Sequence, residues 1–410
     1  MKITQSNASF DQGRCQGVEL ADWRSRASSM VDIAAADPLF CIPVHALSIW
    51  QQHGADTEVV LLGATPFSRS LLSEARTSCR VIGVVDDFRA ASGDLFEGIP
   101  IIDTATLLKL AKDSNRLLTV SGCRYDRSRR HFKRLAERHA IAHLNFEQAM
   151  RLFGLNPARD HRLEDWGATI LRRWPEWLRL ADRMDDEYSR QTLFGVLMTH
   201  LSCNPEWALH VARPYCTLYF RSGLWTASVG ERFVDCGASI AESTSALIDA
   251  CDGEFERIWM IEPDRNNVAV LRKFVADLSP PLGERISVHA CAVSDVASRM
   301  PFHHEGGHGG TLAPLSDLPA EDLVDVVRLD DLLDMEPTLI KMDIEGAELN
   351  ALRGASRCVR AARPKLALSA YHRASDLLDL SEAALELNPD YRVGLRHHTE
   401  ERWDTCLYFY

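Results

Sequence analysis

Two series of short apolar segments, each alternating with helical sequence, constrain the fold of this chain more than any other feature. The first series comprises the apolar segments 59–62, 80–85, 99–102 and 116–120. The second series comprises the segments 232–235, 257–261, 286–290, 339–343 and 365–369. Strands that alternate with helices form βαβ units, which build parallel sheets. The sequence therefore predicts an α/β protein with two Rossmann-like domains.

The segments around these two series set the expected domain limits. Residues 1–54 are expected to form an N-terminal arm with one or two helices, and residues 55–150 a small Rossmann-like domain. Residues 151–214 are rich in leucine, arginine and tryptophan, which predicts a helical connector whose tryptophans belong to the core rather than to an acceptor pocket. A larger α/β domain is expected over residues 215–410. Its last two apolar segments predict an antiparallel hairpin at the sheet edge.

Composition and charge exclude several classes of protein. The formal net charge of −12 over 410 residues argues against a nucleic-acid partner held by a basic surface. The apolar runs end well short of the ~20 residues that span a bilayer, so no membrane span is expected. The N-terminus lacks the apolar core of a secretory signal, and the 11 cysteines form no CxxC pair. We therefore expect a cytoplasmic protein with reduced thiols and no zinc site.

The first strand of the second series ends in a turn of small residues. The segment 234–240 passes from Asp235 into a helix through Gly237, Ala238 and Ser239. Small residues let a ligand approach the backbone, and a helix N-terminus offers unpaired N–H groups. Because the turn has one glycine rather than GxGxxG, it suits the pyrophosphate of a dinucleotide poorly. S-adenosylmethionine carries no phosphate and tolerates such a turn, whereas a purely structural turn is the alternative.

Acidic residues follow the next two predicted strands. Glu262 can accept hydrogen bonds from the two hydroxyls of a ribose. Ser294 and Asp295 follow the third strand, where Asp295 could accept a hydrogen bond from an adenine amino group or simply cap a turn. Ligands of open α/β sheets bind at the carboxyl ends of the strands. The three features together therefore predict a cofactor site.

A further group of polar residues follows the fourth and fifth strands. Asp343, Glu345 and Glu348 lie where a strand passes into a helix. They could shape a polar acceptor site, act as a base or hold a divalent metal ion, although acidic residues also favour the first turn of a helix. His372 follows the fifth strand on the same edge and could take a proton from an acceptor hydroxyl, or be an ordinary loop histidine. We expect Asp343 and His372 to be the catalytic residues.

The motifs of the second series, taken together, match a known pattern. They lie in segments 233–239, 261–264, 291–295, 327–331, 339–349, 352–355 and 369–372. About half of the chain thereby resembles the FkbM family of S-adenosylmethionine-dependent methyltransferases. The resemblance implies a class I methyltransferase sheet of seven strands, the last antiparallel, and O-methylation of a sugar, glycan or natural product. Asp235, Gly237, Glu262 and Asp295 stand at the matching cofactor positions, whereas Ala241 stands where the family more often has a second glycine.

The first domain carries a weaker signal for ligand binding. Residues 63–68 form a turn after the first strand, and Asp86 and Asp87 follow the next strand, as in modules that bind nucleotides or nucleotide sugars. Pro66 and the single glycine argue against tight dinucleotide binding, so docking or dimerisation into a homo-oligomer is the alternative. In the second domain, the glycine-rich segment 303–310 suggests a lid over the acceptor.

These observations favour a methyltransferase that uses S-adenosylmethionine and acts on a small-molecule or glycan acceptor. One alternative is an NAD-dependent sugar-nucleotide oxidoreductase that uses the first domain, although GxGxxG and Tyr-x-x-x-Lys motifs are lacking. Another is a non-catalytic paralogue that binds a ligand, which Ala241 would suggest. A divalent metal held by Asp343, Glu345 and Glu348 stays an open question.

Overall fold

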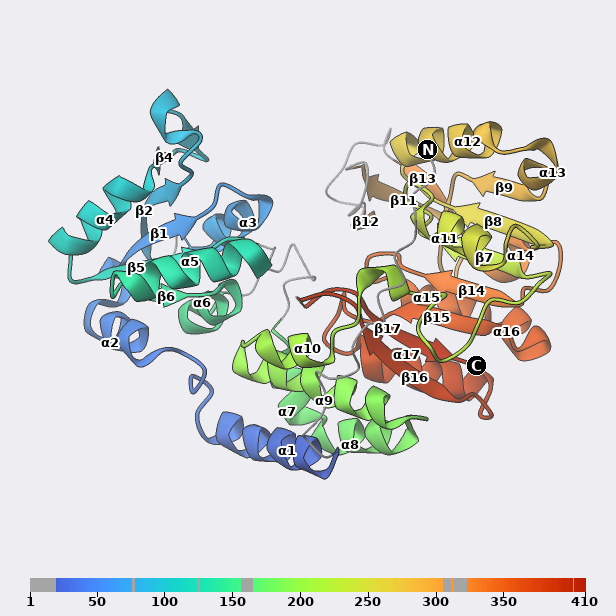
Figure 1. Cartoon of the computed structure of the whole chain (residues 1–410), viewed down its shortest axis with the longest axis horizontal. Coiled ribbons are helices and arrows are strands. Elements are labelled where there is room, and N and C mark those ends of the chain that lie inside the picture. The colour runs from blue at the N-terminus through green and yellow to red at the C-terminus, as the bar shows by residue number, and fades with distance from the viewer. Residues whose placement is uncertain are drawn as a thin grey trace.

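The computed structural model describes residues 20–75, 78–123, 126–155, 165–304, 311–312, 323–400 and 402–410. Two α/β units are present, and a group of helices packs against the second of them (Figure 1). The predicted fold class, with two mainly parallel sheets joined by helices, is confirmed. Residues 1–19 of the expected arm and 305–310 of the expected lid lie outside the described residues.

The first unit contains a six-stranded sheet in the order β3-β4-β2-β1-β5-β6, in which only β3 runs antiparallel to its neighbour. Its strands are β1 (Glu58–Leu62), β2 (Arg80–Val85), β3 (Leu95–Phe96), β4 (Ile99–Ile102), β5 (Leu117–Ser121) and β6 (Ala142–Leu144). Its helices are η2 (Gly54–Asp56), α3 (Pro66–Ala75), η3 (Ala90–Ser92), α4 (Thr104–Asp113), α5 (Asp126–Arg138) and α6 (Phe146–Phe153). Val59 and Leu61 pack on one face of the sheet, and Val60 and Leu62 pack on the other. A central parallel strand is apolar throughout because helices cover both faces.

The second unit contains a seven-stranded sheet in the order β16-β17-β15-β14-β7-β8-β9. Its strands are β7 (Arg232–Cys236), β8 (Arg257–Ile261), β9 (Ile286–His289), β14 (Leu339–Met342), β15 (Lys365–Ser369), β16 (Val393–His397) and β17 (Thr405–Phe409). Its helices are α11 (Glu242–Ala250), α12 (Arg265–Asp277), α13 (Pro280–Gly283), α14 (Leu329–Leu332), α15 (Glu348–Gly354), α16 (Ser356–Ala362) and α17 (Asp376–Leu387). The last strand, β17, is antiparallel to both neighbours, which confirms the predicted hairpin.

A small four-stranded sheet in the order β10-β13-β11-β12 is the main element that the sequence pattern missed. Its strands are β10 (Ala292–Val293), β11 (Ser298–His303), β12 (Thr311–Leu312) and β13 (Leu323–Val327). The two-residue strands β10 and β12 are too short to show the alternation by which a strand is predicted, and β11 contains Pro301, which disfavours the prediction of a strand. This sheet was therefore decided by pairing between segments and not by local sequence.

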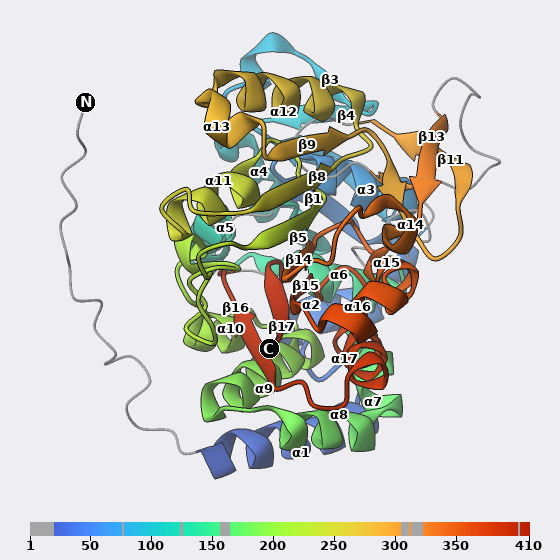
Figure 2. The ribbon, with the colours of Figure 1, turned by 90° about the vertical axis from the view of Figure 1, so that its right-hand side faces the viewer.

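The connecting helices form a layer against the edge of the second sheet (Figure 2). They are α7 (Trp166–Arg172), α8 (Trp174–Arg183), α9 (Glu187–Ser202), α10 (Glu206–Val211) and η5 (Tyr215–Thr217). Helix α9 packs against β16, and α1 (Leu20–Ala36) packs against α9. Trp166 and Trp177 are almost fully buried in the core of this layer. The structure thus supports a structural role for these tryptophans.

Aromatic contacts join the two units. Phe67 at the start of α3 and Trp403 before β17 have ring centroids 5.9 Å apart, and Trp403 also lies edge-on to Tyr371 at 6.1 Å. Tyr371 and Trp403 belong to the same hydrophobic cluster as α2 (Val44–His53) and the core of the first unit. The first unit therefore packs directly behind the loop that follows β15.

Among the described residues, the chain has no helix with the length and apolar character required to span a bilayer. The cysteines in the described part of the chain are free thiols.

One thiol pair leads to a testable prediction. The sulfur atoms of Cys41 and Cys203 are 3.8 Å apart, and Arg151 Nη1 lies 3.3 Å from Cys41 Sγ. The hydrogen bond with Cys203 and the charge of Arg151 lower the pKa of Cys41 to about 7, although burial opposes them. Because the thiolate is the nucleophile, alkylation of Cys41 by iodoacetamide should rise with a midpoint near this pH.

The site of alkylation can be followed by peptide mass spectrometry across a pH series. A Cys203→Ala variant should move the midpoint of Cys41 upward, toward the ~8.5 of an ordinary thiol, because the hydrogen bond is lost. A wild-type midpoint already near that ordinary value would contradict the prediction.

Candidate active site

The predicted site residues lie at one edge of the seven-stranded sheet. The strands β15, β14, β7 and β8 are adjacent and parallel, so their carboxyl ends meet at the same edge. The turn at Gly237 follows β7, Glu262 follows β8, Asp343 follows β14 and His372 comes after β15. Four of the sequence motifs are therefore brought together by the order of the strands.

The turn after β7 requires glycine at position 237. Gly237 has a φ of +78°, and a Cβ atom on it would lie 1.9 Å from the carbonyl oxygen of Asp343. The backbone N–H groups of Gly237 and Ala238 both donate to the carbonyl of Ile261, at 2.9 and 3.2 Å. The absence of a side chain thus lets the turn close on two neighbouring strand ends, one of which carries Asp343.

Alanine takes the place of the second glycine without loss of the turn. Ala241 has a φ of +75° and its backbone N–H donates to Ala238 at 2.8 Å. A left-handed conformation costs an alanine about 1–2 kcal/mol that a glycine would not lose. The departure from the usual family pattern therefore leaves the geometry of the turn in place.

Asp235 is turned inward. Its side chain is fully buried, and one carboxylate oxygen accepts hydrogen bonds from Ser243 Oγ at 2.6 Å and Thr244 Oγ1 at 2.7 Å. Its other oxygen lies 3.2 Å from Lys341 Nζ, and Lys341 also donates to the Gly237 carbonyl at 2.7 Å. Burial lowers the pKa of Lys341, but Asp235 and Asp343 outweigh it and raise this pKa overall. Asp235 therefore holds the turn and the start of α11 in position.

Glu262 lies against the same turn. It is 6% exposed, and its two oxygens accept hydrogen bonds from the backbone N–H groups of Ser239 and Asp264, each at 2.9 Å. Burial raises the pKa of Glu262. Ser239 itself has a φ of +48°, so the turn bends its N–H toward the carboxylate. The structure thus brings the glycine turn and Glu262 into direct contact.

Ser294 and Asp295 are placed differently from the other predicted cofactor residues. They follow β10 in the small sheet, and a Cβ on Gly354 would lie 2.0 Å from the Ser294 carbonyl oxygen. Ser294 Oγ donates to Asp295 at 3.1 Å. The strand end beside Glu262 is instead that of β9, since the Glu262 N–H donates to His289 at 3.1 Å. Contact of Asp295 with an adenine stays a prediction.

Asp343 presents a carboxylate held by two tyrosines. Tyr219 donates to one oxygen at 2.9 Å and Tyr371 to the other at 3.1 Å. Burial raises the pKa of Asp343, but the charges of Lys341 and His372 outweigh this effect and lower it overall. The side chain keeps 24% of its surface exposed. Asp343 is therefore ionised at neutral pH and accessible to a ligand.

His372 is fully buried behind the carboxylates. Its Nδ1 lies 3.1 Å from Glu348 Oε1, and its Nε2 lies 3.6 Å from both Asp343 Oδ1 and Glu345 Oε2. Burial lowers the pKa of His372, but the carboxylates, Glu348 first among them, raise it to about 10. The ring is thus protonated at neutral pH in the absence of other ligands, which does not suit a direct proton acceptor.

The loop after Asp343 carries a strained residue. Glu345 has a φ of +55° and Gly346 has a φ of +93°. A left-handed conformation is unfavourable for glutamate and occurs more often at functional sites than elsewhere. The backbone N–H of Ile344 donates to Glu348 Oε1 at 2.8 Å, which ties this loop to α15.

Three residues of the site were not singled out from the sequence. Lys341 shares a strand face with Asp343 because side chains alternate along a strand, and this spacing could have indicated it. Tyr371 is adjacent to His372, which is a weaker signal. Tyr219 lies outside the strand motifs, 124 residues from Asp343 in sequence, and no local pattern pointed to it.

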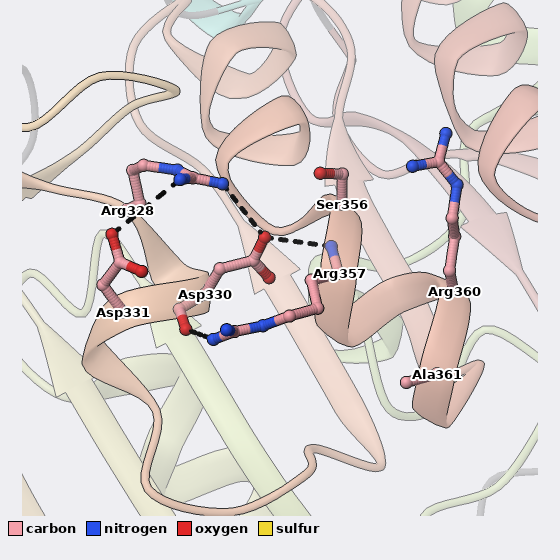
Figure 3. Close-up of a pocket in the computed structure, with 7 residues that line it drawn as sticks. All are labelled: Arg328, Asp330, Asp331, Ser356, Arg357, Arg360 and Ala361. Atoms are coloured by element: carbon pink, nitrogen blue, oxygen red, sulfur yellow. Dashed lines mark hydrogen bonds and ion pairs between the residues drawn. The ribbon is translucent and has the colours of Figure 1, made fainter.

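A surface cavity of about 640 Å³ lies apart from these residues, between α14 and α16. It is lined by Arg328, Asp330, Asp331, Ser356, Arg357, Arg360 and Ala361 (Figure 3). Asp330 accepts hydrogen bonds from the backbone N–H groups of Arg357 and Cys358, both at 2.9 Å. Asp330 therefore caps the first turn of α16, which gives this cluster a structural role.

The side chains around the turn in the first unit contact the protein itself. A Cβ on Gly63 would lie 2.7 Å from Cys123 Sγ, and the buried Ser68 donates its hydroxyl to the Gly63 carbonyl. Asp87 accepts hydrogen bonds from the backbone and the hydroxyl of Thr104, at 2.6 and 2.8 Å. These side chains serve the fold of the unit.

The seven-stranded sheet with its antiparallel β17, and the glycine turn and acidic strand ends at one edge, define a methyltransferase. A family model described as Methyltransferase FkbM domain matches residues 235–392. The crystal structure of methyltransferase FkbM from Methylobacillus flagellatus KT is 45% identical, with a TM-score of 0.87 over 96% of this chain and 100% of that chain. The chain belongs to the FkbM methyltransferase family.

Other comparisons are more distant. Precorrin-6y C5,15-methyltransferase from Geobacter metallireducens GS-15 is 14% identical over 46% of this chain and 81% of that chain, with a TM-score of 0.26. A search of curated proteins gave no match.

Proposed function

We propose that this methyltransferase transfers a methyl group from S-adenosylmethionine to a hydroxyl of a sugar, glycan or natural product. The observation that carries the proposal is the contact of the Gly237 turn with both Glu262 and the Asp343 backbone. The turn thereby lies between Glu262, the carboxylate that we assign to the nucleoside, and Asp343, whose carboxylate is ionised and accessible.

The residues at the turn fit the cofactor. Gly237 lets the turn pack closely against the Asp343 carbonyl, and Glu262 is a carboxylate at a strand end, 6% exposed, where it can accept from ribose hydroxyls. Asp235 and Lys341 would fix the turn without touching the ligand. The cofactor, when bound, supplies a methyl carbon activated by a sulfonium.

The acceptor end of the site is built around Asp343. Its carboxylate can accept the proton of an acceptor hydroxyl, and the hydrogen bonds from Tyr219 and Tyr371 fix its orientation. His372 is fully buried, so we assign it a positioning role, in which it holds the carboxylates of Asp343, Glu345 and Glu348 in place. We propose sugar and natural-product hydroxyls as acceptors because membership of the FkbM family implies them.

Isothermal titration calorimetry with S-adenosylmethionine tests the cofactor site. A Glu262→Gln variant should bind about 10–100-fold more weakly, because charge-assisted hydrogen bonds to the ribose contribute about 1.5–3 kcal/mol. Glu256→Gln is the matched control, since Glu256 precedes the opposite end of the same strand and its side chain is 51% exposed. Equal affinity of wild type and Glu262→Gln would contradict the assignment.

The acceptor class is tested by transfer of a radiolabelled methyl group to a panel of methyl glycosides and glycosylated metabolites. The proposal expects label in an ether that survives mild base, as O-methyl groups on sugars do. Label found only in carboxyl esters or amines would overturn it.

A further inference from the structure

His372 and three carboxylates form a cluster that its internal contacts do not satisfy. One ligand atom each of Asp343, Glu348 and His372 lies within 4.8 Å of the others. His372 is fully buried, and its Nε2 has no hydrogen-bond partner among the described residues. A buried polar atom without a partner costs about 1–3 kcal/mol, so a ligand for the ring is to be expected here.

The distances around Nε2 match a metal centre better than a set of hydrogen bonds. Nε2 lies 3.6 Å from Asp343 Oδ1 and 3.6 Å from Glu345 Oε2, beyond hydrogen-bond range for both. Ligands bound ~2.1 Å from one divalent ion lie roughly 3.0–3.4 Å apart. Shifts of a few tenths of an ångström would therefore bring Nε2 and each of these two oxygens to the spacing of two ligands on one ion.

The surroundings of the cluster resemble the outer shell of a metal site. A histidine that binds a metal usually donates its other N–H to a carboxylate, and Glu348 Oε1 lies 3.1 Å from His372 Nδ1. Metal-binding carboxylates are themselves held by hydrogen bonds, as Tyr219 and Tyr371 hold Asp343. Glu348 is fixed in turn by the Ile344 N–H.

Access and charge are also suitable. The Asp343 and Glu345 side chains are 24% and 20% exposed, so an ion can enter from the acceptor side. Three carboxylates lie around one imidazole, and Lys341, whose charge also acts on Asp343, is itself paired with the buried Asp235. One nitrogen and two oxygen ligands suit an ion of the Mn²⁺ type, between the preferences of Zn²⁺ and Mg²⁺.

We propose that His372 Nε2, Asp343 and Glu345 bind one divalent cation, with Glu348 orienting the histidine. The cation would lower the pKa of a bound acceptor hydroxyl. This role in methyl transfer rests on the function proposed above, whereas binding of the ion does not.

Titration of metal-depleted protein with Mn²⁺, followed by the electron paramagnetic resonance signal of the free ion, tests the site. Wild type should bind one ion per chain. Glu345→Gln and His372→Gln should each raise the Kd for Mn²⁺ at least 10-fold, as should Glu348→Gln. Glu382→Gln is the control, because Glu382 is an exposed acidic residue on α17.

Glu345 lies partly exposed in a loop, so Glu345→Gln should fold even where a change at His372 does not, and circular dichroism checks this. Absence of binding at millimolar Mn²⁺, or equal affinity of Glu345→Gln and wild type, would overturn the proposal. Calorimetry with S-adenosylmethionine on the same metal-depleted protein keeps the two questions apart. If the protein binds S-adenosylmethionine but not Mn²⁺, only the metal-site proposal is wrong. If it binds Mn²⁺ but not S-adenosylmethionine, only the cofactor assignment is wrong.

Discussion

Replacing Asp343 by asparagine is expected to reduce kcat for methyl transfer by about 10²–10⁴-fold, the range that a positioned acid or base contributes. Asparagine keeps the size of the side chain but loses the charge that accepts a proton or holds a cation. The affinity for S-adenosylmethionine should stay within about twofold, because Asp343 contacts the Gly237 turn through its backbone carbonyl.

The measurement uses the best acceptor of the glycoside panel, with calorimetry for the cofactor. Asp390→Asn serves as the control, since the Asp390 side chain is 80% exposed and pairs only with a surface arginine among the contacts given for it, Arg363 at 3.6 Å. Full turnover by Asp343→Asn with intact cofactor binding would refute the assignment of this carboxylate to the acceptor end.

Replacing Lys341 by methionine is expected to lower the free energy of unfolding by about 3–5 kcal/mol, because it leaves a buried charge without a partner. The Lys341 side chain is 3% exposed and Asp235 is fully buried, with 3.2 Å between Lys341 Nζ and the carboxylate. Urea denaturation measures the loss. A second change, Asp235→Asn, should restore part of the stability because it removes the unpaired charge.

The matched control for this prediction is Arg299→Met. The ion pair of Arg299 with Asp325 has side chains that are 66% and 69% exposed, so its loss should change stability by less than about 1 kcal/mol. If Lys341→Met cost no more than Arg299→Met, the buried pair would not be the element that holds the Gly237 turn.

The strands and the motifs at their ends could be predicted because each of them depends on a short, local pattern of residues. Apolar segments of β-strand length mark β7, β8, β14 and β15, and parallel strands necessarily bring their carboxyl ends to one edge. Gly237 and Glu262 could be assigned to one site from this rule alone. The contact of Glu262 with Ser239 agrees with that prediction.

The small sheet of β10 to β13 and the inward direction of Asp235 could not be predicted in the same way. Pairing among these four strands depends on which segments meet in space. An aspartate at a strand end can point toward a ligand or toward the protein interior. Here Ser243, Thr244 and Lys341 surround it, so it turns inward.

The amino-acid sequence by itself determined the two sheets, the glycine turn and the identity of the carboxylates, since backbone preference and hydrophobic period act over a few residues. Only the tertiary structure decided what those side chains do. It brought Tyr219 into a hydrogen bond with Asp343, 124 residues away in sequence, and it buried His372 among three carboxylates. Burial and partners set the charge and direction of an ionisable group, and both come from elements far away in the chain.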